Sequence, residues 1–154
     1  SSFKKTQHNC LIIDDFMHRA ADNLQISELF TKRSHHNNIT IILLLQNLFI
    51  KAKYITDIKR NATYIILMRN PSDEKSIKMF SHQIDPSNPN FLYNVYMDST
   101  RNTAFSYILI DLHQQQKDEV RLRNNIIPEQ DGKKVELIVY IKIPKYFDLF
   151  RRAR

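Results

Sequence analysis

The sequence predicts an α/β protein whose sheet is mostly parallel, with flanking helices. Residues 39–45 form a near-continuous apolar run that only Thr40 interrupts, which is typical of a strand covered on both faces in a parallel sheet. Residues 10–13 form a second apolar strand. The segment between these strands carries apolar residues at approximately helical spacing. Strand, helix and strand in this order favour a parallel pair of strands joined by a helix.

The other elements are predicted from the same two periodicities. Helices are expected over residues 17–32, 48–59, 72–85 and 89–100. Strands are expected over residues 62–68, 105–112, 120–127 and 135–143. Residues 62–68 read as a third buried strand, whereas the strands toward the C-terminal end are expected to pair antiparallel. Ser72 is expected to cap the third helix, which buries Ile77, Phe80 and Ile84.

Composition excludes several classes of protein. Of the 154 residues, 42% are hydrophobic, which is typical of a globular chain with a real core. The one glycine, Gly132, excludes a GxxxxGK(S/T) phosphate-binding loop, which needs two glycines. The one cysteine, Cys10, excludes an internal disulfide and suits a reducing compartment. No apolar run approaches the ~20 residues that span a bilayer, so we expect a soluble, intracellular protein without a membrane partner.

The formal net charge of +7 is concentrated near the C-terminal end. Residues 133–154 hold seven basic residues against two acidic ones, and so carry +5 of the total. Lys133, Lys134, Arg151 and Arg152 are therefore candidate contacts for nucleic acid phosphates. A solvated basic end is the equally simple alternative.

Polar side chains follow both strands of the predicted parallel pair. Asp14 and Asp15 come directly after residues 10–13, and Gln46 and Asn47 come after residues 39–45. In open α/β sheets, ligands bind at the carboxyl edge of the strands. These side chains therefore predict a ligand site, although acids and amides at strand ends can also cap the following helix.

Three segments together resemble a known family. LIIDD, LFTKRSHHNNITIILLLQNLF and NATYIILMRNP are similar to the viral genome-packaging ATPases of the FtsK/HerA superfamily, as carried by adenovirus-like viruses and Maverick-type transposons. The resemblance covers residues 9–128 and implies a P-loop-NTPase-like sheet. That sheet would be incomplete, because the family's Walker A strand lies between the strands that correspond here to 39–45 and 62–68. The implied organisation is a partial ATPase core over 1–128 and a basic strand and tail over 129–154.

The resemblance also implies roles for individual residues. Asp14 would help hold Mg²⁺, Asp15 would polarise the attacking water, and Gln46 would be the polar sensor of the γ-phosphate, with Asn47 beside it. Arg33 is a candidate for the arginine that reaches the nucleotide of a neighbouring subunit. Arg60 and Arg69 are further candidates for that role. The intact parent would bind Mg²⁺ and ATP, assemble as a ring, translocate double-stranded DNA and contact capsid or portal-type proteins, in the nucleus, at a viral assembly site or in the virion.

This chain also departs from the family pattern. Lys32–Arg33 stands where relatives read Arg-Gly, and Ser72–Asp73 stands where they read Arg-Asp. Without a Walker A loop, residues 1–154 alone are expected not to hydrolyse ATP. Two alternatives to a packaging ATPase remain. The chain could be a non-catalytic module that binds nucleic acid or protein, or a decayed copy of an endogenous element. A zinc site is disfavoured, since adjacent His35 and His36 cannot chelate as an i, i+4 pair does.

Overall fold

The structure is a computed structural model that describes residues 8–14, 24–33, 38–47, 53–101, 105–127, 129–130, 132–134, 136–141 and 152–153. The chain divides into two compact units, Ser1–Ala62 and Thr63–Arg154. The boundary between these units separates two compact groups of contacts. The boundary predicted after residue 128 rests instead on the family resemblance and on the charge of the tail, and it stays a prediction.

The first unit contains a parallel pair of strands. β1 (Asn9–Ile13) and β2 (Ile39–Leu43) run side by side, with register from Asn9 opposite Ile39 to Ile13 opposite Leu43. The connection includes α2 (Leu24–Glu28) and the π-helical turn η1 (Leu29–Arg33), and β2 is followed by α4 (Ile55–Asn61). The two predicted strands are therefore confirmed, although β2 ends two residues earlier than expected. The first parts of the two predicted helices lie outside the described residues.

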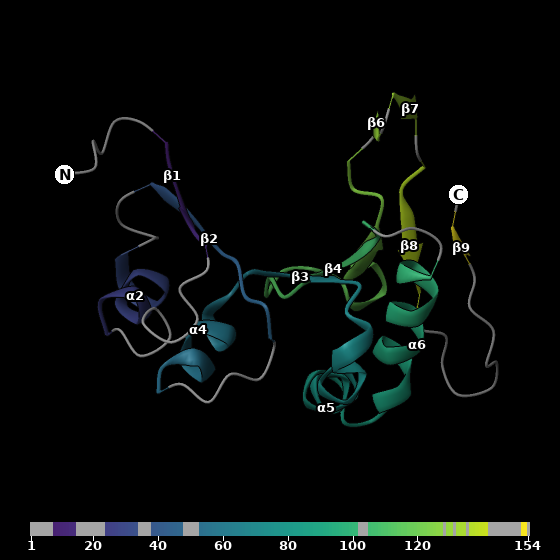
Figure 1. Cartoon of the computed structure of the whole chain (residues 1–154), viewed down its shortest axis with the longest axis horizontal. Helices are drawn as coiled ribbons and strands as arrows, with labels where there is room; N and C mark the ends of the chain where they lie inside the picture. Colours follow the sequence, from purple (N-terminus) through teal and green to yellow (C-terminus); the bar gives the residue numbers. More distant parts are fainter. Residues whose placement is uncertain are drawn as a thin grey trace. The chain divides into compact units, whose positions relative to one another are not determined.

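Only one face of this pair is well covered. Ile39 is buried, but Ile12, Ile42 and Leu44 on the opposite face are 61%, 41% and 45% exposed. Figure 1 shows α2 and α4 on the same side of the two strands. The expectation of a strand covered on both faces is thus wrong for the described residues. A continuous apolar run shows that both faces can be buried, but it does not supply the element that buries the second one.

The second unit is built on an antiparallel sheet. Its strand order is β3 (Tyr64–Met68), β4 (Tyr107–Asp111), β5 (Leu122–Asn124), β8 (Ile138–Tyr140) and β9 (Arg152–Ala153). A separate antiparallel ribbon pairs β6 (Glu129–Gln130) with β7 (Lys133–Lys134). The predicted antiparallel strands near the C-terminal end are confirmed. The mostly parallel sheet is wrong, because within the described residues only β1 and β2 are parallel.

The largest correction concerns β3. This strand pairs antiparallel with β4, from Tyr64 opposite Asp111 to Met68 opposite Tyr107, and it lies at the edge of its sheet. It is not a third buried strand, since Tyr64, Ile66 and Met68 are each more than half exposed. Its apolar composition resembles that of a central strand, but only one face of β3 is covered, so alternate side chains stay exposed.

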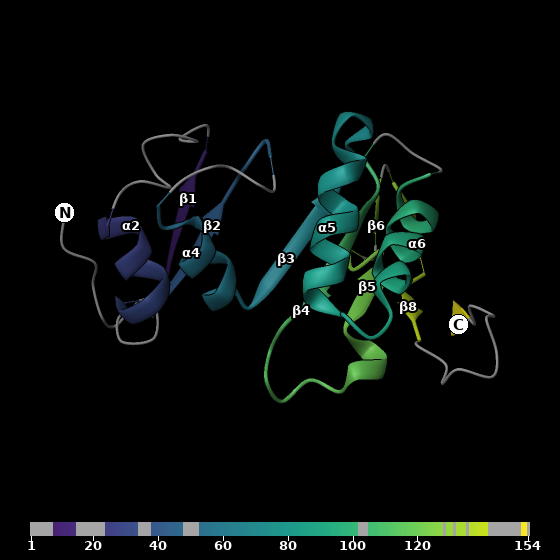
Figure 2. The same ribbon diagram turned by 90° about the horizontal axis from the view of Figure 1, so that it is seen from below.

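Two helices connect β3 to β4 and cover one face of the sheet. They are α5 (Glu74–Ile84), which follows the 3₁₀ turn η2 (Pro71–Asp73), and α6 (Pro89–Thr100). Figure 2 shows them side by side. The bounds of α6 are those expected from the sequence, because Pro89 suits the first turn of a helix.

The start of α5 differs from the expectation. Ser72 does not cap the helix. Asn70 Oδ1 instead accepts hydrogen bonds from the Ser72 amide (3.3 Å) and hydroxyl (2.7 Å), and so caps η2. Ile77 and Phe80 are buried as expected, whereas Ile84 is exposed.

The core of the second unit lies between β4 and the two helices. Every residue of β4 is buried, and the exposed fractions of Ile108 and of Val95 in α6 are 0%. β4 is thus the most deeply buried strand of this unit, which makes its two ends well-fixed positions for polar side chains. No helix in the described part of the chain is long and apolar enough to cross a membrane.

Candidate functional site

The parallel pair of the first unit brings three of the predicted site residues to one edge. Asp14 directly follows Ile13, and the amide of Leu44 donates to the carbonyl of Ile13 at 2.9 Å, so the two strands end together. Gln46 and Asn47 lie two and three residues after Leu44. All three side chains are exposed. The carboxyl edge therefore presents one carboxylate and two amides to solvent.

The opposite edge of the same pair is closed by internal hydrogen bonds. His8 Nδ1 lies 3.0 Å from Asn38 Oδ1, and His8 Nε2 lies 2.8 Å from Thr40 Oγ1. Asn38 has a φ of 52°, which asparagine tolerates better than most residues, and its carbonyl accepts from the amide of Asn9 at 2.9 Å. These polar groups serve the entry into the strands, so the carboxyl edge is the better candidate for a ligand site.

Several predicted site residues are not placed. Asp15, Arg151 and the pair His35–His36 lie outside the described residues. Arg33 ends η1, Lys133 and Lys134 form β7, and Arg152 begins β9, but the side chains of these four lie outside what the structure describes. Their predicted roles stay predictions.

A magnesium ion is compatible with the carboxyl edge. Mg²⁺ keeps several waters and is often held by one or two carboxylates together with substrate phosphates, and Asp14 is an exposed carboxylate in a suitable position. Within the described residues, no group of three or more His, Cys, Asp or Glu side chains is placed to hold a metal. Asp14 thus fits the ion, but it does not define a site without further ligands.

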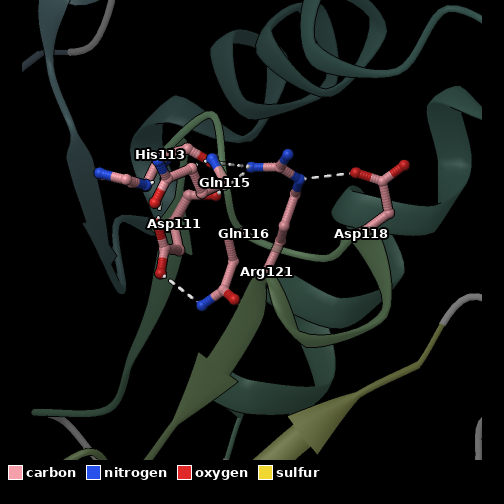
Figure 3. A network of polar contacts seen from close by, with 6 residues as sticks. All are labelled: Asp111, His113, Gln115, Gln116, Asp118 and Arg121. Atoms are coloured by element: carbon pink, nitrogen blue, oxygen red, sulfur yellow. Dashed lines mark hydrogen bonds and ion pairs between the residues drawn. The ribbon is translucent and has the colours of Figure 1, made fainter.

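A second polar cluster, which the sequence did not indicate, lies at the end of β4. Asp111 is only 3% exposed. Its carboxylate accepts hydrogen bonds from the amide of His113 (3.0 Å) and from Gln116 Nε2 (2.8 Å), and it forms an ion pair with Arg123 Nη2. Figure 3 shows Gln116 turning back toward the carboxylate. Every one of these partners belongs to the loop after β4 or to β5.

Arg121 holds the same loop from its other side. Its Nη1 donates to the carbonyls of Asp111 and His113, both at 3.0 Å, and its Nε pairs with Asp118 at 2.7 Å (Figure 3). One guanidinium thus joins three points of the connection between β4 and β5. The cluster fixes a hairpin connection that is longer than most.

Sequence could have suggested Asp111 only as an acid at a strand end, the same signal that Asp14 gives. The feature that distinguishes the two is Arg123, which reaches Asp111 because β4 and β5 pair antiparallel with Leu109 opposite Arg123. The buried acid is already neutralised by this arginine. It is therefore a structural anchor rather than a catalytic group.

The environment of Asp111 lowers the pKa of its carboxyl from the ordinary value of 3.8. Burial by itself would raise the pKa, but the hydrogen bonds from the His113 amide and from Gln116, with the charge and hydrogen bond of Arg123, outweigh it. A carboxyl whose pKa is lower in the folded chain stabilises the fold at pH values above the pKa that it has in the unfolded chain. This stabilisation is lost as the pH falls through the pKa of the folded chain.

This sign gives a pH dependence that can be measured. We expect the free energy of unfolding of the wild-type chain to fall as the pH drops below about 4, and the corresponding fall in Asp111→Asn to be smaller. Urea unfolding at a series of pH values measures both curves. Parallel curves down to the lowest pH at which both chains fold would contradict the proposed charge on Asp111.

Comparison with known proteins adds no assignment: no protein-family model, curated protein or solved structure matches this chain. The fold and the two polar clusters define an α/β protein with a parallel pair of strands and an antiparallel sheet.

Proposed function

We propose that this chain is the latter half of a viral-type DNA-packaging ATPase, whose intact form couples Mg-ATP hydrolysis to translocation of double-stranded DNA. The observation that carries the proposal is the carboxyl edge of β1 and β2. There a strand ending in an acid lies parallel to a strand followed by an exposed glutamine and asparagine. Such an edge is where α/β sheets bind ligands.

Each side chain at this edge has a task in that reaction. Asp14 is a carboxylate that suits Mg²⁺, which supplies neutralisation of the phosphate charge when bound. Asp15, the next residue, would polarise the attacking water. Gln46 would orient that water with its amide, and Asn47 would support the same group. Arg33, Arg60 and Arg69 stay candidates for the arginine that acts on a neighbouring subunit in a ring.

The free edge of β2 is compatible with a missing strand. Among the described residues β2 pairs only with β1, so its other edge could accept a further strand. In the family that the sequence resembles, the Walker A strand pairs at the corresponding position. A strand there would satisfy the unpaired backbone groups of β2. The absence of a phosphate-binding loop also explains why this chain alone is expected to be inactive.

The test compares residues 1–154 with a form extended upstream, each with Asp15→Asn and Gln46→Ala. We expect Mg-ATP hydrolysis only in the extended form. In that form each substitution should lower the hydrolysis rate by about a hundredfold or more, because each removes a group that acts on the attacking water. Glu119→Gln, an exposed acid in the second unit, is the control and should leave the rate unchanged. Full turnover in both site variants would refute the proposal.

A non-catalytic nucleic-acid-binding module is the second candidate. The observation that favours it is the β6–β7 ribbon, in which Lys133 and Lys134 begin the segment that carries most of the net charge. If neither form binds nucleotide while residues 1–154 bind DNA in a salt-sensitive way, the ATPase proposal is refuted. The chain is then a nucleic-acid-binding module, or a decayed copy that retains such a module. Contacts with capsid or portal-type proteins belong to the ATPase proposal alone.

A further inference from the structure

β3 presents a row of exposed apolar side chains beside a free strand edge. Tyr64, Ile66 and Met68 alternate with better-covered residues and are 57%, 53% and 56% exposed, so their side chains lie on one face of the strand. Among the described residues β3 pairs with β4 only, because it is the last strand of its sheet. These three residues are called the β3 edge below.

The same three residues turn their backbone groups away from β4. The amide of Leu112 donates to the carbonyl of Thr63 at 2.9 Å, so these two residues form a hydrogen-bonded pair of the antiparallel ladder. In such a ladder, hydrogen-bonded pairs alternate with pairs whose N–H and C=O groups point outward. Ile65 and Leu67 therefore bond to β4, whereas the backbone groups of the β3 edge point to the open side.

A buried tyrosine marks the point at which this open edge ends. The hydroxyl of Tyr96 in α6 accepts from the amide of Asn70 at 2.9 Å and donates to the carbonyl of Met68 at 3.3 Å. Tyr96 is 2% exposed, so this contact is part of the core. The open edge is therefore short and well fixed, and it runs from Tyr64 to the amide of Met68.

We propose that two copies of this chain associate through the β3 edge, as an antiparallel pair of β3 strands with a two-fold axis at Ile66. Ile66 then lies opposite its own counterpart, and Tyr64 lies opposite Met68 of the second copy. This register matches every outward-pointing residue of one strand with one of the other. A shift by one residue would place outward groups opposite inward ones, and a shift by two would leave one residue of each strand unmatched.

The composition of β3 favours a second copy as the partner. The strand contains no charged residue, no proline and no bulge, which are features that commonly protect an edge strand from pairing with another chain. Self-pairing therefore places no like charges opposite one another, and it sets an aromatic ring beside a thioether. Arg69, the nearest charge, would lie opposite Thr63. The two Arg69 residues would be about 20 Å apart, where salt screens their repulsion.

This pair differs from the ring of the ATPase proposal. A two-fold pair uses the same surface of both copies and closes with two, because each copy contributes its one free β3 edge. A Walker A strand supplied by an extended form would compete for this edge, so the inference concerns residues 1–154 and does not depend on ATP hydrolysis. One strand from each copy is smaller than a standard interface, so we expect a dissociation constant on the order of 10–100 μM.

Sedimentation velocity of residues 1–154, from about 1 to about 300 μM, measures the association. We expect a monomer at the lowest concentration and mostly a dimer at the highest. Ile66→Lys places two lysines opposite each other on the axis and should raise the dissociation constant at least about tenfold. Ile127→Lys is the matched control, since Ile127 is 54% exposed and lies outside β3. It adds the same charge and should leave the constant within about twofold.

Crosslinking tests the register without adding charge. In a Cys10→Ser background, which removes the one native cysteine, Ile66→Cys should give a covalent dimer with a short bis-maleimide, because the two thiols lie opposite each other. Tyr64→Cys should not, because its two copies are four residues apart along the pair, or about 13 Å, beyond the reach of the reagent. An equal mixture of Tyr64→Cys and Met68→Cys should crosslink. Circular dichroism checks the fold of each variant.

Three results would overturn the inference. They are a wild-type chain that stays monomeric at the highest concentration, equal effects of Ile66→Lys and Ile127→Lys on association, or equal crosslinking of Tyr64→Cys and Ile66→Cys. A monomeric chain would leave the β3 edge to a different protein or to an upstream strand. Asp15→Asn and Gln46→Ala should not alter the association, so failure of the ATPase proposal is seen separately.

Discussion

Ile108→Ala is expected to lower the free energy of unfolding by about 3–4 kcal/mol. Ile108 is the most buried side chain of β4, at 0% exposure, on the face that α6 covers. Its truncation removes buried methyl and methylene groups and leaves a cavity that rigid neighbours fill only in part, which typically costs about 2–5 kcal/mol. Urea unfolding followed by far-ultraviolet circular dichroism measures the change.

Ile66→Ala is the matched control for that substitution. Ile66 has the same side chain and lies in the neighbouring strand β3, but it is 53% exposed. Its truncation should therefore cost less than about 1 kcal/mol, since little apolar surface is returned to water. A loss equal to that of Ile108→Ala would mean that β3 is covered on both faces, and would restore the expectation of a third buried strand.

Asp111→Ala is expected to lower the free energy of unfolding by about 3 kcal/mol. The substitution leaves Arg123 without its ion-pair partner and leaves the His113 amide and Gln116 without their acceptor. Removing one member of a buried pair typically costs about 3–5 kcal/mol, and Arg123 is partly exposed, which places the expected loss at the lower end. Thermal and urea unfolding measure it.

Two further variants separate the ion pair from other causes. Asp118→Asn removes an acid that is 86% exposed and pairs with Arg121, so it should change stability by less than about 1 kcal/mol. Asp111→Leu combined with Arg123→Leu removes both charges, together with the buried Arg123 Nε, which has no partner among the described atoms. The double variant should be more stable than Asp111→Ala, because no buried charge is left unpaired. A double variant as unstable as the single one would point to packing rather than charge.

Local signals were sufficient where an element depends on its own residues. α6 has the bounds expected from Pro89 and from its apolar spacing, and β1 and β2 lie parallel, as the intervening helical pattern favours. The positions of Asp14, Gln46 and Asn47 at one edge follow directly from that pairing. Propensity and periodicity are enough here because each of these features is decided by neighbours in the chain.

Tertiary structure decided the remaining features. The apolar run of residues 62–68 is compatible with a central parallel strand, yet β3 lies at the edge of an antiparallel sheet, since α5 and α6 bring the chain back with the opposite direction. The buried network of Asp111 required β5 to place Arg123 beside the acid, and a pairing between strands cannot be read from either strand alone. The sequence by itself thus determined the elements and the polar edge of the first unit. The packing of strands that are distant in the chain determined which faces are buried and which acid is neutralised.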